Sequence, residues 1–352
     1  AGHYEHREGA WIAEPSWPSP NVRPADYFLS TDRSLAPRDG RPQGVCEHSS
    51  PPDVGMASGK WCGYSKPGDA PLDKRRDDAG SLTFETAPLE EALDIAGDAQ
   101  VVLDVEVDRP VAQLAVRLSD VHPDGRSTRV TFGVLNLTHR DGHEHPQALE
   151  PGRRTTIRVP MKHVAQRFRP GHRVRLALST NYFPMIWPAP ERVTLRVHTE
   201  ASRLILPVRG PAPEDAGLRP FEEAEGAPPI AKDVLEAPEE YWEIVEDART
   251  GEMEMRLADG GGRVHFHAND LETYSQGHES YRIGPADLTS ATGHTRWRYE
   301  MARGDWRVAT ETETTLTADK ADFIVRARMR AWEGDTLVHE QEWDERIPRN
   351  LV

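Results

Sequence analysis

Residues 112–137 read AQLAVRLSDVHPDGRSTRVTFGVLNL, two runs of apolar and β-branched residues joined by the turn sequence HPDG at residues 122–125. In the first run apolar and polar residues partly alternate, which is typical of a strand with one buried and one exposed face. The Pro, Asp and Gly of the connection supply the backbone conformations that a tight turn requires. The stretch therefore predicts two antiparallel strands joined by a turn.

The same pattern extends over residues 81–209. Short runs rich in Val, Leu and Thr are separated by turn-forming residues, at residues 81–86, 100–108, 154–161, 172–180 and 191–199. Only MKHVAQRF, residues 161–168, has a helical character. Several strands without intervening helices are typical of a two-sheet sandwich, so we expect a jelly-roll β-sandwich here.

A second set of strand-like runs follows, at residues 241–247, 252–259, 263–270, 295–303, 306–318, 322–334 and 336–346. Short polar connections such as ARGD and WEGDT favour tight antiparallel turns between several of them. The expected fold class is therefore all-β, a jelly-roll β-sandwich followed by a second antiparallel β-meander domain.

The last strands of this second set show a clear alternation. Phe323, Val325, Ala327, Met329 and Ala331 share one face of a strand, and the other face carries arginines at positions 326, 328 and 330. Successive side chains of a strand point to opposite sides of the sheet. We therefore expect one buried face and one solvated face in the meander.

The chain of 352 residues is longer than one hydrophobic core usually supports, so we expect two domains. Residues 1–80 are rich in Pro and Gly with scattered aromatic residues, which predicts an extended wrap packed on the sandwich. The sandwich should cover residues 81–209. A linker dense in Pro and Glu should cover residues 210–240, followed by an acidic antiparallel domain at residues 241–352.

The net charge of −15 is concentrated in the C-terminal part. Residues 211–352 contain 16 Lys and Arg against 31 Asp and Glu, which leaves 27 of each kind in residues 1–210. An acidic surface argues against nucleic acid as a partner. No apolar run approaches the length of about 20 residues that spans a bilayer, so we expect no membrane partner and a cytoplasmic location.

The chain contains two cysteines, Cys46 and Cys62. Their spacing fits neither a redox pair nor half of a zinc site, so two free thiols are expected, with a single disulfide as the alternative.

The sequence contains no pattern typical of catalysis or nucleotide binding. A serine hydrolase of the α/β class needs its nucleophile in a G-x-S-x-G turn, and this pattern is absent, as are the glycine-rich phosphate loops. We therefore expect no catalytic residue and no cofactor in this chain.

Two groups of histidines are candidates for metal binding. His139, His143 and His145 lie in THRDGHEHP, and His265 and His267 lie in RVHFHAND. A polar hairpin loop and a solvated strand face explain these groups without an ion, so no metal site is expected.

Three ordered sequence blocks carry a resemblance to a known family. They are SLTFETAPLEEALDIAG at residues 81–97, VRLSDVHPDGRSTRVTFGVLNLTHR at 116–140 and FRPGHRVRLALSTNYFP at 168–184. In order and spacing they resemble the C-terminal domain of the X-Pro dipeptidyl-peptidase and cocaine-esterase-like serine hydrolases, over residues 11–209.

The resemblance implies a jelly roll packed against an α/β-hydrolase domain whose Ser, Asp and His triad cleaves peptide, amide or ester bonds. We expect those catalytic parts to precede residue 1. The chain would then be the non-catalytic C-terminal region of a serine hydrolase, its partner the catalytic domain of the same protein, and inactive alone.

The resemblance also implies that the jelly roll borders the active site, and the candidates to face it are Trp61, Cys62 and Tyr64. Rigid aromatic side chains on an irregular loop can line apolar pockets at low entropic cost, and the alternative is that they only pin the loop to its own sandwich.

A second group of residues is expected to be structural. Asp120, Asp124 and Gly125 should form a turn, and Arg126 should clamp a carboxylate. Gly171 and His172 should likewise belong to a turn and to the core.

Two other functions remain open. A free-standing carbohydrate- or ligand-binding module would show exposed aromatic residues in a row on one strand face. The acidic meander could instead be a lid or a homo-oligomer contact, because its charged faces could pair between subunits.

Overall fold

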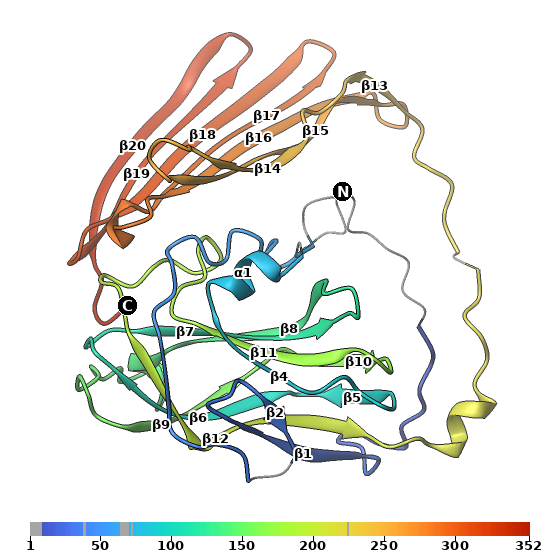
Figure 1. Cartoon of the computed structure of the whole chain (residues 1–352). Helices are drawn as coiled ribbons and strands as arrows, with labels where there is room; N and C mark the ends of the chain where they lie inside the picture. The colour runs from blue at the N-terminus through green and yellow to red at the C-terminus, as the bar shows by residue number, and fades with distance from the viewer. Residues whose placement is uncertain (1–8, 38–39, 64–69, 72, 224) are drawn as a thin grey trace. The chain divides into compact units, whose positions relative to one another are not determined.

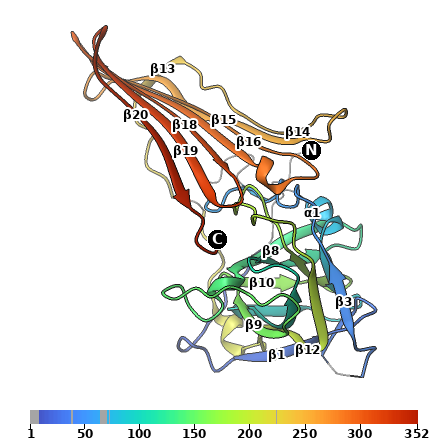
Figure 2. The same cartoon turned by 90° about the vertical axis from the view of Figure 1, so that its left-hand side faces the viewer.

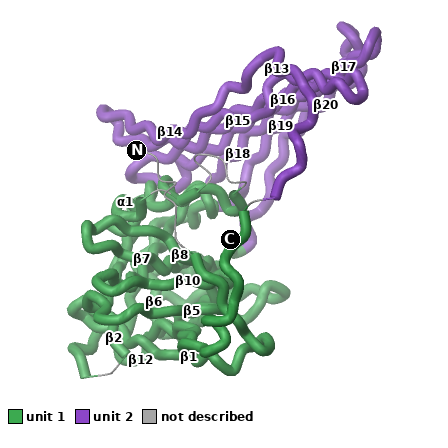
Figure 3. The backbone as a smooth tube through the Cα atoms, turned by 90° about the vertical axis from the view of Figure 1, so that its right-hand side faces the viewer, with its two compact units in different colours: residues 1–223, 351–352 green, residues 224–350 purple. Residues whose placement is uncertain are grey.

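The computed structural model describes residues 9–37, 40–63, 70–71, 73–223 and 225–352. The chain divides into two compact units, residues 1–223 with 351–352 and residues 224–350 (Figure 3). All pairs of named strands are antiparallel. The predicted all-β class, a β-sandwich followed by an antiparallel meander, is confirmed.

The first sheet of the sandwich is built around one long strand, β12, which pairs with β1, β3, β5 and β6. Its strands are β1 (Val22–Leu29), β2 (Leu35–Ala36), β3 (Val45–His48), β5 (Leu93–Gly97), β6 (Gln100–Val107), β9 (Thr155–Pro160), β10 (Val164–Phe168) and β12 (Leu195–Arg209). Residues 1–80 thus contribute strands to the sheet, because β1 pairs with β12 over seven positions from Val22↔Arg209 to Phe28↔Arg203.

The second sheet has the order β4-β11-β7-β8 (Figure 1). Its strands are β4 (Leu82–Glu85), β7 (Gln113–Val121), β8 (Ser127–Asn136) and β11 (Arg173–Ser179). The predicted hairpin of residues 112–137 is confirmed as β7 and β8. The His122 amide donates to the Arg126 carbonyl at 2.9 Å across the turn.

The hydrophobic core lies between these two sheets. The first sheet contributes Leu103 of β6 and Val197 of β12. The second sheet contributes Val116 of β7 and Leu176 of β11, and all of these side chains are buried in one cluster. Each such side chain stabilises the fold by about 1.5 to 3 kcal/mol when it leaves water.

One local prediction is wrong. Residues 161–168, expected to be helical, contain strand β10, whose residues pair with β5 from Val164↔Gly97 to Phe168↔Leu93. The reason is tertiary: the unpaired edge of β5 offers a ladder of hydrogen bonds that a short helix cannot match. Within the described residues the α-helix is α1 (Arg75–Ala79), which precedes β4.

The second unit is one eight-stranded sheet with the order β13-β15-β16-β17-β18-β19-β20, and β14 pairs with β15 (Figure 2). Its strands are β13 (Lys232–Glu236), β14 (Tyr241–Glu246), β15 (Met253–Phe266), β16 (Leu271–Ile283), β17 (Thr292–Arg303), β18 (Trp306–Ala318), β19 (Asp322–Glu333) and β20 (Thr336–Pro348). Strand β13 lies inside the segment 210–240 that was expected to be a linker.

The two faces of β19 differ in burial as expected, but the apolar face is less buried than predicted. Phe323, Val325 and Met329 are only half-buried, while Arg326 and Arg328 on the opposite face are exposed. Within its described residues this unit has a single sheet, so no second layer of the same unit covers the apolar face. The described helices of the chain also include none that is long and apolar enough to cross a membrane.

Candidate functional site

A hollow of about 370 Å³ lies beside Trp61 on the surface of the first unit. It is lined by Trp61, Phe132 and Arg129 together with Lys60, Lys162 and His163. Trp61 comes from the long loop before α1, Arg129 and Phe132 come from β8, and Lys162 lies between β9 and β10. The site therefore exists only where three distant stretches of the chain meet.

Two aromatic rings and one ammonium group form the centre of this hollow. The rings of Trp61 and Phe132 meet edge to face, with centroids 5.3 Å apart. The Lys162 Nζ atom lies 4.2 Å from the Trp61 ring centroid and 4.6 Å from that of Phe132. Ammonium groups at such distances are attracted to the negative faces of aromatic rings. Trp61 nevertheless remains 52% exposed, so part of its surface is open to a ligand.

Arg129 brings a second positive charge to the wall. Its guanidinium carbon lies 4.3 Å from the Phe132 ring centroid. Its Nη1 atom donates to the Ser58 carbonyl at 2.9 Å and to the Tyr182 hydroxyl at 3.2 Å. Burial raises the pKa of Tyr182, so this phenol stays protonated at neutral pH. The hollow therefore combines apolar ring surface with two cations.

The loop before Trp61 is held against the sandwich at Gly55. This residue has φ +112°, and a Cβ atom there would lie 2.4 Å from the backbone carbon of Tyr182. Its amide donates to Asp77 Oδ1 at 3.1 Å, and the Asn181 side chain donates to the Pro52 carbonyl. Only glycine allows the two backbones to approach this closely.

A buried network of charged side chains also holds this loop, through a hydrogen bond to the loop backbone. Lys74 Nζ donates to Asp77 Oδ2 at 3.0 Å and to the Ala57 carbonyl, and both charged side chains are fully buried. Burial lowers the pKa of Lys74 to about 8, against the opposing attraction of Asp77. Burial also opposes ionisation of Asp77, but the charges of Lys74 and Arg117 outweigh it, and the pKa of this carboxyl lies below its usual value.

The network continues into the second sheet through Asp78. Arg117 Nη2 lies 3.5 Å from Asp78 Oδ1, and Arg175 Nη1 donates to Asp78 Oδ2 at 2.7 Å. Arg175 also binds Glu85. Helix α1 is therefore tied to β7, β11 and β4, and the position of the loop is set by the sandwich.

Of the three residues expected to face a substrate, Trp61 lines the hollow and Cys62 follows it as an exposed free thiol. Tyr64 lies outside the described residues. Cys46 is also free, and it is buried. The sequence interpretation missed Phe132, Arg129 and Lys162. Arg129 and Phe132 belong to the predicted strand that forms β8, but nothing in the sequence indicated that Trp61 would pack on them or that Lys162 would join them.

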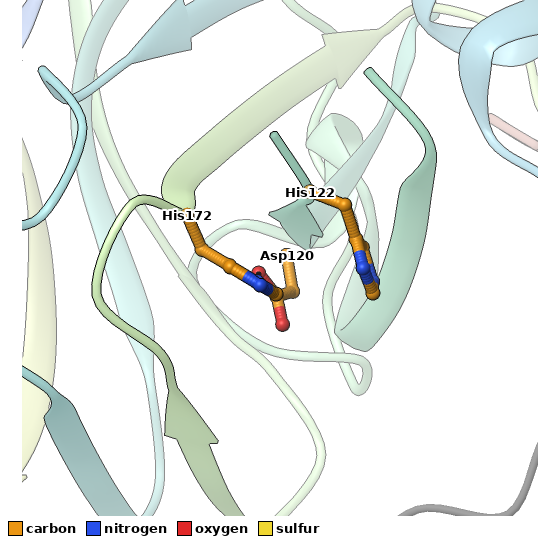
Figure 4. A group of neighbouring side chains, drawn as sticks. All are labelled: Asp120, His122 and His172. Atoms are coloured by element: carbon orange, nitrogen blue, oxygen red, sulfur yellow. Dashed lines mark hydrogen bonds and ion pairs between the residues drawn. The ribbon is translucent and has the colours of Figure 1, made fainter. Parts of the chain in front are cut away.

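Of the residues expected to be structural, Asp120 lies in strand β7 and not in a turn, and the others lie in the turn after β7 and in the turn before β11. The Arg126 amide and Nε both donate to the Asp124 carboxylate, at 3.0 and 2.7 Å. Gly125 and Gly171 have φ of +86° and +81°. His172 Nδ1 lies 2.8 Å from Asp120 Oδ1, and the His122 ring lies beside both (Figure 4).

The five histidines considered as metal ligands from the sequence have local partners. His139 Nδ1 lies 3.0 Å from His143 Nδ1 in an exposed loop, and His145 is exposed beside Glu144. His265 Nε2 and His267 Nε2 lie near Asp270 and Asp233, at 2.8 and 3.0 Å. Over the described part of the chain, no serine hydroxyl is hydrogen bonded to a histidine ring.

The sequence profile that matches this chain describes the X-Pro dipeptidyl-peptidase C-terminal non-catalytic domain, and it covers residues 3–214. The chain belongs to this family. Domains of this family are non-catalytic parts of serine hydrolases, in agreement with the resemblance found in the sequence.

Individual relatives of this non-catalytic domain are esterases by name. A putative serine esterase of Mycobacterium bovis is 28% identical over 229 residues, 58% of this chain and 36% of the relative. The cocaine esterase of a Rhodococcus species is 24% identical over 190 residues, 49% of this chain and 32% of the relative. The chain thus spans about a third of the length of these relatives.

A solved structure shares the fold of the non-catalytic domain. It is an aminopeptidase from a marine sediment Thaumarchaeota archaeon, with a TM-score of 0.50 and 21% identity, covering 57% of this chain and 39% of the other. The match concerns the fold. The hollow at Trp61 lies inside the residues that the family profile covers, whereas the acidic meander lies beyond them.

Proposed function

We propose that this chain is the accessory region of a serine hydrolase that cleaves peptide, amide or ester bonds, and that it borders the active site of an α/β-hydrolase catalytic domain in the same protein. The family assignment of residues 3–214 supports the accessory role. The single observation that carries the substrate-facing role is the half-exposed Trp61 at the mouth of the hollow.

The chemistry of the hollow favours a particular kind of substrate group. The Trp61 and Phe132 rings offer apolar surface to an aliphatic or aromatic acyl group, because such groups lose unfavourable contact with water there. Lys162 and Arg129 would attract a carboxylate or a polarised carbonyl oxygen on the same group. We therefore propose an acyl group with an apolar body and a polar end.

The proposal is tested by activity with and without the catalytic domain. The purified chain alone should not hydrolyse p-nitrophenyl esters or X-Pro amides, and the protein that also contains the catalytic domain should hydrolyse one of these classes. Turnover by the chain alone that a serine-directed reagent abolishes would contradict the accessory role.

A carbohydrate-binding module is the second candidate, favoured by one observation in the meander. The rings of Trp297 and Tyr299 on β17 stack with centroids 5.7 Å apart and planes inclined by 8°, and Tyr299 is 49% exposed. Sugar rings stack on platforms of this kind. Glycan-array binding by the wild-type chain that is lost in Tyr299→Ala would favour this function. If the chain binds no glycan on the array, the carbohydrate-binding function is wrong.

We also propose a cytoplasmic location. Assembly of the chain into a homo-oligomer is a second proposal, which a separate experiment tests. The two free thiols support a reducing compartment, where disulfides are rare. Light scattering on the full chain and on a version ending at residue 223 compares their oligomeric states. An unchanged state argues against assembly through the meander.

A further inference from the structure

Three potential metal ligands meet at one end of the second sheet, outside the hollow at Trp61. Asp120 lies at the end of β7, His122 lies in the turn that follows, and His172 lies in the turn before β11. Each residue offers one ligand atom, and these atoms all lie within 4.8 Å of one another. The two imidazole rings have centroids 4.6 Å apart, and the Asp120 carboxylate lies beside them (Figure 4).

We propose that Asp120, His122 and His172 form a binding site for a divalent transition metal ion, with Zn2+ as the best match. Zinc takes imidazole nitrogen and carboxylate oxygen at about 2.0 to 2.2 Å, which places tetrahedral ligand atoms about 3.4 Å apart. The three ligand atoms lie within 4.8 Å of one another, so each would need to move by a small amount to reach that spacing around an ion. Three protein ligands leave the fourth position to water.

The charge balance around Asp120 is the second argument. Its side chain is 9% exposed, and among the described residues its only hydrogen-bond partner is His172 Nδ1, itself on a side chain that is 12% exposed. A buried carboxylate is costly without a matching positive charge. A divalent cation between Asp120 and the two imidazoles supplies that charge.

The neighbouring groups are compatible with a cation. Asp124 brings a second carboxylate near His122, and Arg126, whose Nε donates to Asp124 at 2.7 Å, offsets its charge, so Asp120 supplies the negative charge of the site. Thr128 Oγ1 lies 3.2 Å from His122 Nε2. A hydroxyl or carboxylate at this distance can orient a metal-binding imidazole through its second nitrogen.

A rival cluster in the meander is less suited to tight binding. Asp233, His265 and His267 also have ligand atoms within 4.8 Å of one another. There, however, the Asp233 side chain is 61% exposed, and His265 Nε2 is already paired with Asp270 at 2.8 Å. Water competes more strongly for exposed ligands, so the partly buried site should bind first.

The site would act as a structural link. Strands β7 and β11 are already neighbours, with Val174 opposite Asp120. A bound ion would join the turn after β7 to the turn before β11 and close this end of the second sheet. The free energy of metal binding at such a site stabilises the folded state by the same amount.

Zinc titration of the full chain tests the proposal. After treatment with a chelator and its removal, Zn2+ is added in competition with a chromophoric chelator to wild type, His122→Gln and His267→Gln. We expect one tight site in wild type, at least tenfold weaker in His122→Gln and unchanged in His267→Gln. Equal affinity in wild type and His122→Gln, or loss only in His267→Gln, would overturn the proposal.

A second readout does not depend on a variant. One equivalent of Zn2+ added to the wild-type chain should shift the ring nitrogen resonances of His122 and His172 in a histidine-selective NMR spectrum before those of any other histidine. If exposed histidines such as His139 and His143 respond first, the binding is adventitious and the proposed site is wrong. Circular dichroism of His122→Gln checks that the variant keeps its β structure.

Discussion

Lys162 Nζ lies 4.2 Å from the centroid of the Trp61 ring and donates a hydrogen bond to the carbonyl oxygen of the same tryptophan at 3.1 Å. One side chain thus contacts both the ring and the backbone of a residue 101 positions away. It fixes the loop before α1 to the sandwich and leaves a positive charge at the mouth of the hollow.

Trp61→Ala should lower the activity of the enzyme that contains this chain and its catalytic domain. Loss of a ring face that contacts the acyl group should reduce kcat/KM for apolar esters about tenfold, equivalent to about 1.4 kcal/mol. Steady-state kinetics on esters of increasing acyl length measure this effect, and the loss should grow with length.

Trp306→Ala is the matched control, because Trp306 is also exposed but belongs to the meander. An equal loss in both variants, or none in Trp61→Ala, would show that Trp61 does not face the substrate.

Lys162→Met should loosen the Trp61 loop with little effect on the sandwich. The substitution keeps an unbranched chain but removes the charge and the hydrogen-bond donor, together worth about 1 to 2 kcal/mol. Limited proteolysis should cut faster near Trp61, while urea unfolding of the sandwich should keep its slope. Unchanged protease sensitivity would mean that Lys162 does not hold the loop.

Lys74→Met should be strongly destabilising, because it leaves the buried carboxylate of Asp77 without its cation. Removing one partner of a buried ion pair costs about 3 to 5 kcal/mol. Urea denaturation compares wild type, Lys74→Met and the double variant Lys74→Met with Asp77→Asn. The double variant should recover part of the loss, whereas additive losses would argue against coupling between the pair.

Gly55→Ala should cost about 3 kcal/mol or more, because it combines an unfavourable positive φ with a Cβ atom pressed against the Tyr182 backbone. Gly217→Ala is the control, since no atom lies within 4 Å of its added Cβ. Thermal unfolding of both variants gives the comparison. A similar melting temperature for the two would contradict the close approach seen at Gly55.

The ion pair between Arg209 and Asp215 should stop stabilising the fold at acid pH. Arg209 holds the pKa of Asp215 at about 2, below the ordinary value of 3.8, with help from the Ala13 amide. A carboxyl with a lowered folded-state pKa contributes stability above its unfolded pKa and loses it as the pH falls. This contribution should be complete above pH 3.8 and disappear towards pH 2.

The stability difference between wild type and Asp215→Asn, measured by urea unfolding across this range, checks the prediction. The difference should be constant near neutral pH and vanish at the acid end. A difference that persists unchanged at the acid end would show that Asp215 acts through something other than its charge.

Local patterns predicted the parts of this protein that depend on neighbours in sequence. The β7–β8 hairpin follows from alternating residues around a turn at Gly125, and the alternation of β19 follows from the same rule. Strand β16, in contrast, was not expected. Its Gly277 interrupts the pattern, and it is tolerated because the Trp297 ring of β17 occupies the space that a Cβ would need.

The sequence by itself therefore determined the all-β class, the strand-rich character of both units and the family of residues 3–214. Only the tertiary structure decided that residues 164–168 form a strand, that Trp61 meets Phe132 and Lys162, and that Asp120, His122 and His172 share one end of a sheet. The physical reason is the distance along the chain over which each interaction acts. Strand periodicity and turn preference act over a few residues, whereas strand pairing, ring packing and buried charges join segments that are brought together only when the sheets form their common core.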